Sequence, residues 1–311
     1  MSIGIGLGVA GFPFSSQHAF LKWIDLCEDR GVDSVWLSER IVSRQPNLEL
    51  MTTFGVIAGR TERLKFGMNA IVVPLRDPLI LAKQCASLDY LSGGRLLPVF
   101  GVGGETNPEF AATGRSPKGR GAQSDEALDL LAALWTGEPV TYEGQHYRYR
   151  NAVISPRPIQ QPLPLWIGGS SEAAIRRTAR IGTGWLAGLQ SPAQVAPVVA
   201  AIRERSAANG RPLDDDHYGA GFAFRFGSWD EPVVQRQASV FARIPDAPAP
   251  ADYLAIGSAQ DIAARIREYI AAGISKFVLR PLAEDDEGLI VQTRRLCEEV
   301  IPQFASLRPA S

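Results

Sequence analysis

The stretch Pro164–Glu172, with the sequence PLWIGGSSE, joins a short apolar strand to a turn of glycines and serines, and a predicted helix over 173–181 follows at once. Glycine lets a backbone come close to a ligand, and the first turn of a helix presents unpaired N–H groups at the positive end of its dipole. The stretch therefore predicts either a main-chain cradle for a phosphate or an ordinary helix cap made by one of its serines. The cradle would use Gly168, Gly169, Ser170 and Ser171.

The composition limits the class of protein. The 311 residues are 45% hydrophobic, which is enough to bury a large core. Lysine and arginine number 32 against 33 acidic residues, and no basic stripe with interleaved aromatics is present, so we expect no nucleic-acid partner. The three cysteines and three histidines lack the spacing of a disulfide framework or a metal site. With no signal-peptide pattern and no long apolar run, we expect a cytoplasmic protein that does not enter a membrane.

Predicted strands and helices alternate along almost the whole chain. The predicted strands cover residues 3–9, 34–37, 64–73, 95–102, 164–168, 184–187, 218–226 and 276–279, and a helical pattern follows each of them. Eight such units predict an α/β fold, a single (β/α)8 TIM barrel over residues 1–311. The alternation is interrupted at about 103–122, 136–163 and 228–256, where we expect insertions, the second of them containing a hairpin.

A doubly wound sheet is the alternative fold, because Gly6–Gly11 matches the dinucleotide-binding pattern G-x-G-x-x-G after a strand. However, Pro13 follows the pattern and the next helix begins only near Gln17, whereas the fingerprint needs its glycines to open the helix directly. A glycine-rich first strand in a barrel, where neighbouring strands approach closely, explains the pattern at least as well.

Four stretches in this order and spacing carry a family resemblance: Arg95–Glu105 (RLLPVFGVGGE), Tyr142–Tyr147 (YEGQHY), Leu165–Ser170 (LWIGGS) and Gly182–Trp185 (GTGW). Together they resemble the luciferase-like monooxygenase superfamily of flavin- and deazaflavin-dependent barrels. The resemblance implies an oxidoreductase that acts on a small organic substrate, and a homodimer. Its cofactor would be either reduced FMN, for monooxygenation, or coenzyme F-420, for hydride transfer. The glycines at 101–104 look more like the deazaflavin branch, because the FMN branch tends to place an arginine there for the flavin phosphate.

The resemblance also implies cofactor-binding residues beyond the cradle, namely Ala70, Ile71, Gly103, Gly104 and Trp185. A cis peptide between Ala70 and Ile71 would support the middle ring of the cofactor.

Candidate catalytic residues follow from the same resemblance. Dehydrogenases of this kind often carry an acidic residue and then a histidine after the second strand, and this chain has Glu39 and Arg40. Arg40 cannot act as a base at neutral pH, but its guanidinium suits a carboxylate or developing negative charge. Glu105 is a second candidate acid or base, and Arg280 is a candidate ligand for an acidic group. For each of these residues the alternative is a solvated charge or a loop cap.

A non-redox barrel enzyme, an aldolase or isomerase that binds a phosphorylated substrate at the same cradle, is the alternative function. It would need a lysine or an acid–base pair at the strand ends. Lys65 and Lys276 lie at strand starts instead, on the face of a barrel that serves stability.

Overall fold

The computed structural model describes residues 2–241, 243–244 and 247–307. Its strands are short segments buried on both faces, as expected for parallel strands that helices cover. Their bounds are β1 (Gly4–Val9), β2 (Ser34–Leu37), β3 (Lys65–Met68), β4 (Ile71–Val72), β5 (Leu96–Leu97), β6 (Val99–Gly101), β9 (Trp166–Gly168), β10 (Gly184–Leu186), β11 (Tyr218–Phe226) and β13 (Lys276–Pro281).

These strands close into a barrel of eight, which confirms the predicted fold. The third and fourth predicted strands are each split in two, into β3 and β4 and into β5 and β6. The hydrogen-bonded order is β4, β6, β9, β10, β11, β13, β1, β2, β3 and β5. β3 pairs with β5 and β4 pairs with β6, so the third and fourth barrel strands meet through two separate ladders and the ring closes with one break between them. The doubly wound alternative is therefore wrong.

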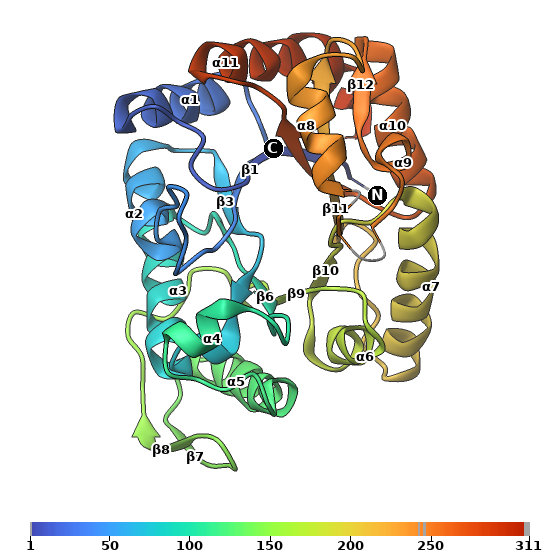
Figure 1. Ribbon diagram of the computed structural model, residues 1–311. Coiled ribbons are helices and arrows are strands. Elements are labelled where there is room, and N and C mark those ends of the chain that lie inside the picture. Colours follow the sequence, from blue (N-terminus) through green and yellow to red (C-terminus); the bar gives the residue numbers. More distant parts are fainter. Residues whose placement is uncertain (1, 242, 245–246, 308–311) are drawn as a thin grey trace.

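A ring of helices surrounds the barrel (Figure 1). It consists of α1 (Gln17–Asp29), α2 (Leu50–Arg60), α3 (Pro78–Ser92), α5 (Arg120–Leu134), α6 (Glu172–Ile181), α7 (Pro192–Ala208), α10 (Ala259–Ala271) and α11 (Asp286–Arg295), which continues through η2 (Leu296–Val300) into η3 (Ile301–Leu307). Side chains that accept first-turn N–H groups start most of these helices, for example Ser16, Asp77 and Ser191. Within the described residues, no helix combines the length and the apolarity needed to cross a membrane.

The segments predicted as insertions hold the remaining elements. They are α4 (Pro108–Ala112), the antiparallel pair β7 (Val140–Glu143) and β8 (Arg148–Ala152), α8 (Pro232–Phe241), α9 (Pro250–Tyr253) and β12 (Ala255–Gly257), with η1 (Val73–Leu75) directly after β4. The hairpin expected in the second segment is present and projects from the ring of helices (Figure 1). β12 extends the sheet by pairing with the end of β11.

Glycines on the strands make room for tryptophans inside the barrel. A Cβ added to Gly67 would lie 2.4 Å from the Trp36 ring, and one added to Gly184 would lie 2.2 Å from Trp166. Gly6 also faces this interior, because a Cβ there would lie 2.9 Å from Trp36 Nε1. Gly6, one of the glycines that match the dinucleotide fingerprint, is therefore required by packing. Trp166 belongs to the packed interior of the barrel.

Arg95, at the start of the fourth strand, is a buried cation held by five hydrogen bonds. Its guanidinium donates to the carbonyl oxygens of Ala58 and Thr61 at the end of α2, at 2.9 and 2.8 Å. It also donates to Thr61 Oγ1 at 2.6 Å, to the Leu64 carbonyl at 2.8 Å and to the Ser92 carbonyl at 2.7 Å. The Arg95 side chain thus joins the ends of α2 and α3 to the starts of β3 and β5.

We predict that Arg95→Met lowers the free energy of unfolding by about 3 kcal/mol, because several buried carbonyl groups lose a charged donor. Urea denaturation followed by tryptophan fluorescence measures the change. Arg148→Met, at an exposed position on β8, is the control and should shift stability by no more than about 0.5 kcal/mol. Equal effects of the two substitutions would show that the Arg95 network does not brace the barrel.

Candidate functional site

A cavity of about 290 Å³, here called the mouth cavity, opens where the barrel strands end. Its walls come from β1, β10, β11 and β13, from the residues that follow β1, β2, β3 and β10, and from α9. The polar side chains that line it are Ser38, Arg40, Asn69, Tyr253 and Arg280. Among the described residues that line this cavity, none is a carboxylate. The C-terminal ends of barrel strands are where active sites of this architecture form.

Two arginines give the mouth cavity a positive potential. Arg40 Nη1 donates only to the carbonyl of Glu39, at 3.4 Å, and Arg280 Nη2 donates to the Tyr253 hydroxyl at 2.7 Å. Neither guanidinium forms an ion pair with any residue that the structure describes. A guanidinium without a carboxylate partner, facing a cavity, suits an anionic ligand.

Tyr253 supplies a proton donor beside Arg280. Burial raises the pKa of its hydroxyl, and the neighbouring Arg280 opposes part of this rise. The hydroxyl is therefore protonated at neutral pH. Its oxygen accepts the hydrogen bond from Arg280, which leaves its own proton for an acceptor in the mouth cavity.

The cis peptide lies one bond earlier than predicted. It joins Asn69 and Ala70, so the expectation of a cis bond between Ala70 and Ile71 is wrong. The hydrogen bonds explain this position. The Asn69 N–H still donates to the Leu37 carbonyl at 2.9 Å, whereas Ile71 already pairs with Phe100 on β6. The turn between the two ladders therefore falls at Asn69–Ala70. The Ile71 side chain is fully buried in the core, so only its main chain can face a cofactor.

Three nearly bare positions form a floor next to this turn. A Cβ added to Gly101 would lie 3.7 Å from the Ala70 Cβ, and one added to Gly168 would lie 3.5 Å from it. These are ordinary van der Waals distances, so the packing of the protein does not itself require glycine at either position. The absence of side chains leaves a smooth, partly exposed surface, which fits a planar ring system.

A second cavity, of about 590 Å³, lies between β9 and the first turn of α6 and is here called the β9–α6 cavity. All four residues of the predicted cradle line it. Gly169 has φ +98°, a conformation that favours glycine. Ser171 caps α6 by accepting the Ala174 N–H at 3.2 Å, so the helix-cap prediction holds for this serine. The Ser170 hydroxyl donates to the Gln190 side chain.

Trp185 supports this cavity from behind. Its side chain is fully buried, and its indole N–H donates to the Gly169 carbonyl at 2.7 Å. Trp185 therefore holds the Gly169 backbone in place and does not itself line the cavity.

The loop after β6 has a required glycine and a cation that sequence reasoning missed. A Cβ on Gly103, which has φ +71°, would lie 2.9 Å from Val72 Cγ1, so this position needs glycine. Arg120, in the first turn of α5, donates from Nε to the Gly103 carbonyl at 3.0 Å and lines the β9–α6 cavity. Gly104 and Glu105 are exposed and line neither cavity. In the sequence, the two glycines that flank Arg120 were the pattern that could have marked it as a candidate binding residue.

Glu39 is buried behind the floor rather than in the mouth cavity. Burial raises the pKa of its carboxyl, against the effects of Arg76 and of the Val72 N–H. Its Oε2 accepts the Val72 N–H at 3.0 Å, and Oε1 pairs with Arg76, which also contacts Glu49 at 3.3 Å. These contacts fix β4 and η1 against the end of β2. Glu109 was also missed: it is buried and accepts the Ile41 N–H at 2.7 Å in the loop after Arg40.

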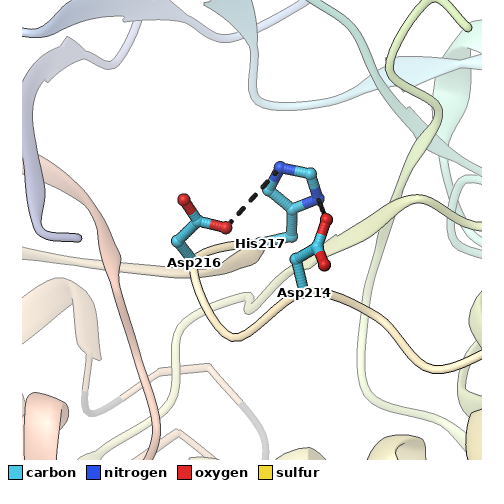
Figure 2. A group of neighbouring side chains, drawn as sticks. All are labelled: Asp214, Asp216 and His217. Atoms are coloured by element: carbon cyan, nitrogen blue, oxygen red, sulfur yellow. Dashed lines mark ion pairs between the residues drawn. The ribbon is translucent and has the colours of Figure 1, made fainter. Parts of the chain in front are cut away.

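The opposite end of the barrel contains a histidine between two carboxylates (Figure 2). His217 precedes β11, and its Nδ1 lies 2.8 Å from the Thr183 carbonyl. Asp214 lies 4.0 Å from Nδ1 and Asp216 lies 3.9 Å from Nε2. One side-chain ligand atom from each of the three residues lies within 4.8 Å of the other two, close enough for a metal ion, although the carboxylates flank different ring nitrogens and the Thr183 carbonyl lies at Nδ1.

Comparisons with known proteins were made on the whole chain. The family described as Luciferase-like monooxygenase matches residues 10–236. The F420-dependent glucose-6-phosphate dehydrogenase of Amycolatopsis mediterranei is 27% identical, over 90% of this chain and 92% of that protein. The enzyme of the same name from Microbacterium testaceum is 28% identical, over 94% and 96%. An uncharacterized protein of Mycobacterium tuberculosis is 31% identical, but the match covers 51% of this chain and about half (54%) of that protein.

Solved structures show the same fold at low identity. Monooxygenase RslO1 from Streptomyces bottropensis superposes with a TM-score of 0.84 at 22% identity, over 97% of this chain and 100% of that one. An F420-dependent secondary alcohol dehydrogenase in complex with an F420–acetone adduct gives a TM-score of 0.82 at 18% identity, over 96% and 98%.

We predict that Gly169→Val weakens the binding of a phosphate-bearing cofactor at least tenfold. A β-branched residue resists a positive φ, and its side chain would crowd the β9–α6 cavity. Quenching of cofactor fluorescence on titration with protein measures the affinity.

Gly210→Val is the matched control, because Gly210 also has a positive φ (+68°) but follows α7, outside both cavities. It should lose similar stability and keep cofactor affinity. If both variants bind the cofactor as tightly as the native protein, the phosphate is held elsewhere.

Proposed function

The chain belongs to the luciferase-like monooxygenase family of oxidoreductases, and on that basis we propose that it transfers a hydride between coenzyme F-420 and a small organic anion. The observation that carries the proposal is the mouth cavity, where two arginines without carboxylate partners lie at the strand ends. The two relatives matched over at least 90% of this chain are F420-dependent by name, which favours F-420 over FMN.

The residues present fit such a cofactor. Its phosphate would lie in the β9–α6 cavity on the main chain of Gly169 and Ser170, with Arg120 as the cation. Its ring would lie over Ala70, Gly101 and Gly168. When bound there, the deazaflavin supplies or takes up the hydride.

The substrate would be held by the chain itself. Arg40 and Arg280 bind its anionic group, and the Tyr253 hydroxyl donates a hydrogen bond to its reacting oxygen. Because burial keeps Tyr253 protonated, Tyr253 Oη can deliver the proton that accompanies reduction of a carbonyl to an alcohol. In this proposal Glu39 is a structural residue that holds β4 in place through the Val72 N–H. Glu105 lines neither cavity, so a catalytic role for it would require its loop to move toward the mouth cavity.

An FMN-dependent monooxygenase is the second candidate. Arg120 favours it, because FMN ends in a phosphate monoester, which carries more negative charge than the phosphodiester of F-420. The non-redox alternative has weaker support. Lys65 and Lys276 are both tied to Asp33, at 3.2 Å each, at the end of the barrel away from the mouth.

We also propose that the protein is a homodimer that packs through α2. The exposed face of this helix carries small residues, namely Thr52, Gly55, Val56 and Gly59. Glycine inside a helix costs about 1 kcal/mol relative to alanine, yet a Cβ added at Gly55 or Gly59 would meet nothing within 4 Å. A second copy packed closely against this face would explain both glycines. Exposed apolar residues also lie on the neighbouring helix α3, for example Ile80 and Leu91.

The cofactor proposal predicts that the protein binds F-420 at least tenfold more tightly than FMN in either oxidation state. Fluorescence titration of the protein with each cofactor measures this. Tighter binding of FMN, with oxygen consumption in the presence of reduced FMN, would establish the second candidate instead. If neither cofactor binds, the redox assignment fails and the non-redox alternative gains support.

The dimer proposal predicts that Gly55→Lys yields a monomer of about 33.7 kDa by sedimentation, whereas the native protein has twice this mass. Lysine is a better helix former than glycine, so the monomer should keep its fold, which circular dichroism would verify. Ala200→Lys, at an exposed position on α7, is the control and should remain a dimer. A dimeric Gly55→Lys variant would place the interface elsewhere.

A further inference from the structure

A third cavity, of about 340 Å³, adjoins the mouth cavity and is here called the α8 cavity. The two cavities share Val9, Ala10 and Arg280. The α8 cavity lies over the ends of β1, β11 and β13, with one side of α8 above it. Figure 1 shows α8 at this end of the sheet, close to β11. Arg280 therefore stands at the junction of two connected spaces.

The lining of the α8 cavity is mainly apolar. Six of its side chains are Val9, Pro13, Ala223, Val233, Leu282 and Leu289. The polar side chains are Arg236, Gln237 and Glu284, besides Arg280. Arg236 and Glu284 pair with each other at 2.5 Å and are 63% and 55% exposed, so they form the outer rim and satisfy one another. A ligand that reaches past Arg280 meets aliphatic groups.

The cofactor would leave this space free. The β9–α6 cavity is built at β6 and β9, the fourth and fifth strands around the barrel. The α8 cavity is built at β11, β13 and β1, which lie across the barrel from them. A cofactor with its phosphate at Gly169 and its ring over Ala70, Gly101 and Gly168 would lie on residues that do not line the α8 cavity, so this cavity would be left to the substrate.

We propose that the substrate is an organic anion with an apolar arm: its anionic group binds Arg280 and Arg40, and its arm fills the α8 cavity. The assignment of this ligand as a redox substrate rests on the proposed function; its binding does not. Each buried methylene of the arm would add to affinity through the hydrophobic effect. A sugar phosphate would fit poorly, because its hydroxyl groups would lose hydrogen bonds against Val9, Val233 and Leu289. This chain would then differ in substrate from the relatives whose names specify glucose 6-phosphate.

The test is calorimetric binding of acetate, butyrate, hexanoate, octanoate and glucose 6-phosphate, with the protein both free of cofactor and loaded with F-420. Affinity should rise about two- to fourfold for each methylene from acetate to hexanoate, the upper figure applying to full burial. Hexanoate should bind at least tenfold more tightly than glucose 6-phosphate. A flat series, or tighter binding of glucose 6-phosphate, would overturn the proposal.

Variants separate the two parts of the ligand. Val233→Asn should abolish the dependence on chain length while acetate binds as before, and Arg280→Met should weaken the whole series by a similar factor. Val291→Asn, on an exposed part of α11, is the matched control and should change neither. A series that keeps its slope in Val233→Asn would show that the arm lies elsewhere. If F-420 fails to bind while affinity still rises with chain length in the cofactor-free protein, the proposed hydride transfer is wrong, whereas the proposal that the α8 cavity binds an apolar arm is supported.

Discussion

Closure of the barrel between its third and fourth strands is the constraint on which the rest of the structure depends. Two ladders of two residue pairs each, β3 with β5 and β4 with β6, complete the ring of strands. Such short ladders need support, and the buried guanidinium of Arg95 supplies it by joining α2 and α3 to the start of β5. At the break between the ladders, Asn69 lines the mouth cavity and Ala70 lies beside Gly101 and Gly168. The segment that closes the sheet therefore also contributes residues to the candidate site.

The two ends of the barrel differ in how their charges are paired. At the start of the strands, Asp33 lies between Lys65 and Lys276, and these two lysines hold the pKa of its carboxyl below its usual range although burial alone would raise it. At the other end, Arg40 and Arg280 have no carboxylate partner among the described residues. Paired charges stabilise a fold, whereas unpaired charges beside a cavity are available to a ligand. This asymmetry supports a site at the mouth.

Local patterns were sufficient for the fold. Alternating strands and helices predicted all eight barrel strands. The glycines and serines at 168–171, which the sequence suggested as a phosphate cradle, line a cavity in the structure, and their binding of a phosphate stays a prediction. Residues brought together from distant segments were not predictable. Tyr253 reaches Arg280 from an irregular segment, and Arg120 reaches Gly103 from a helix that begins after a polar loop. The position of the cis peptide depends on which ladder holds Asn69, and no single sequence shows that.

The tryptophans inside the barrel restrict the routes by which substrate enters and product leaves. Trp36 and Trp166 pack with Val99, Leu186 and Val278 along the axis, and glycines on adjacent strands let the indole rings fit tightly. With the axis filled, nothing that enters at the mouth can leave through the opposite end of the barrel. A cofactor ring on the floor would then lie beneath any substrate, and each product must depart before the next molecule can arrive. Substrate and product therefore use the same end of the barrel, and product that leaves slowly competes directly with fresh substrate for the same space.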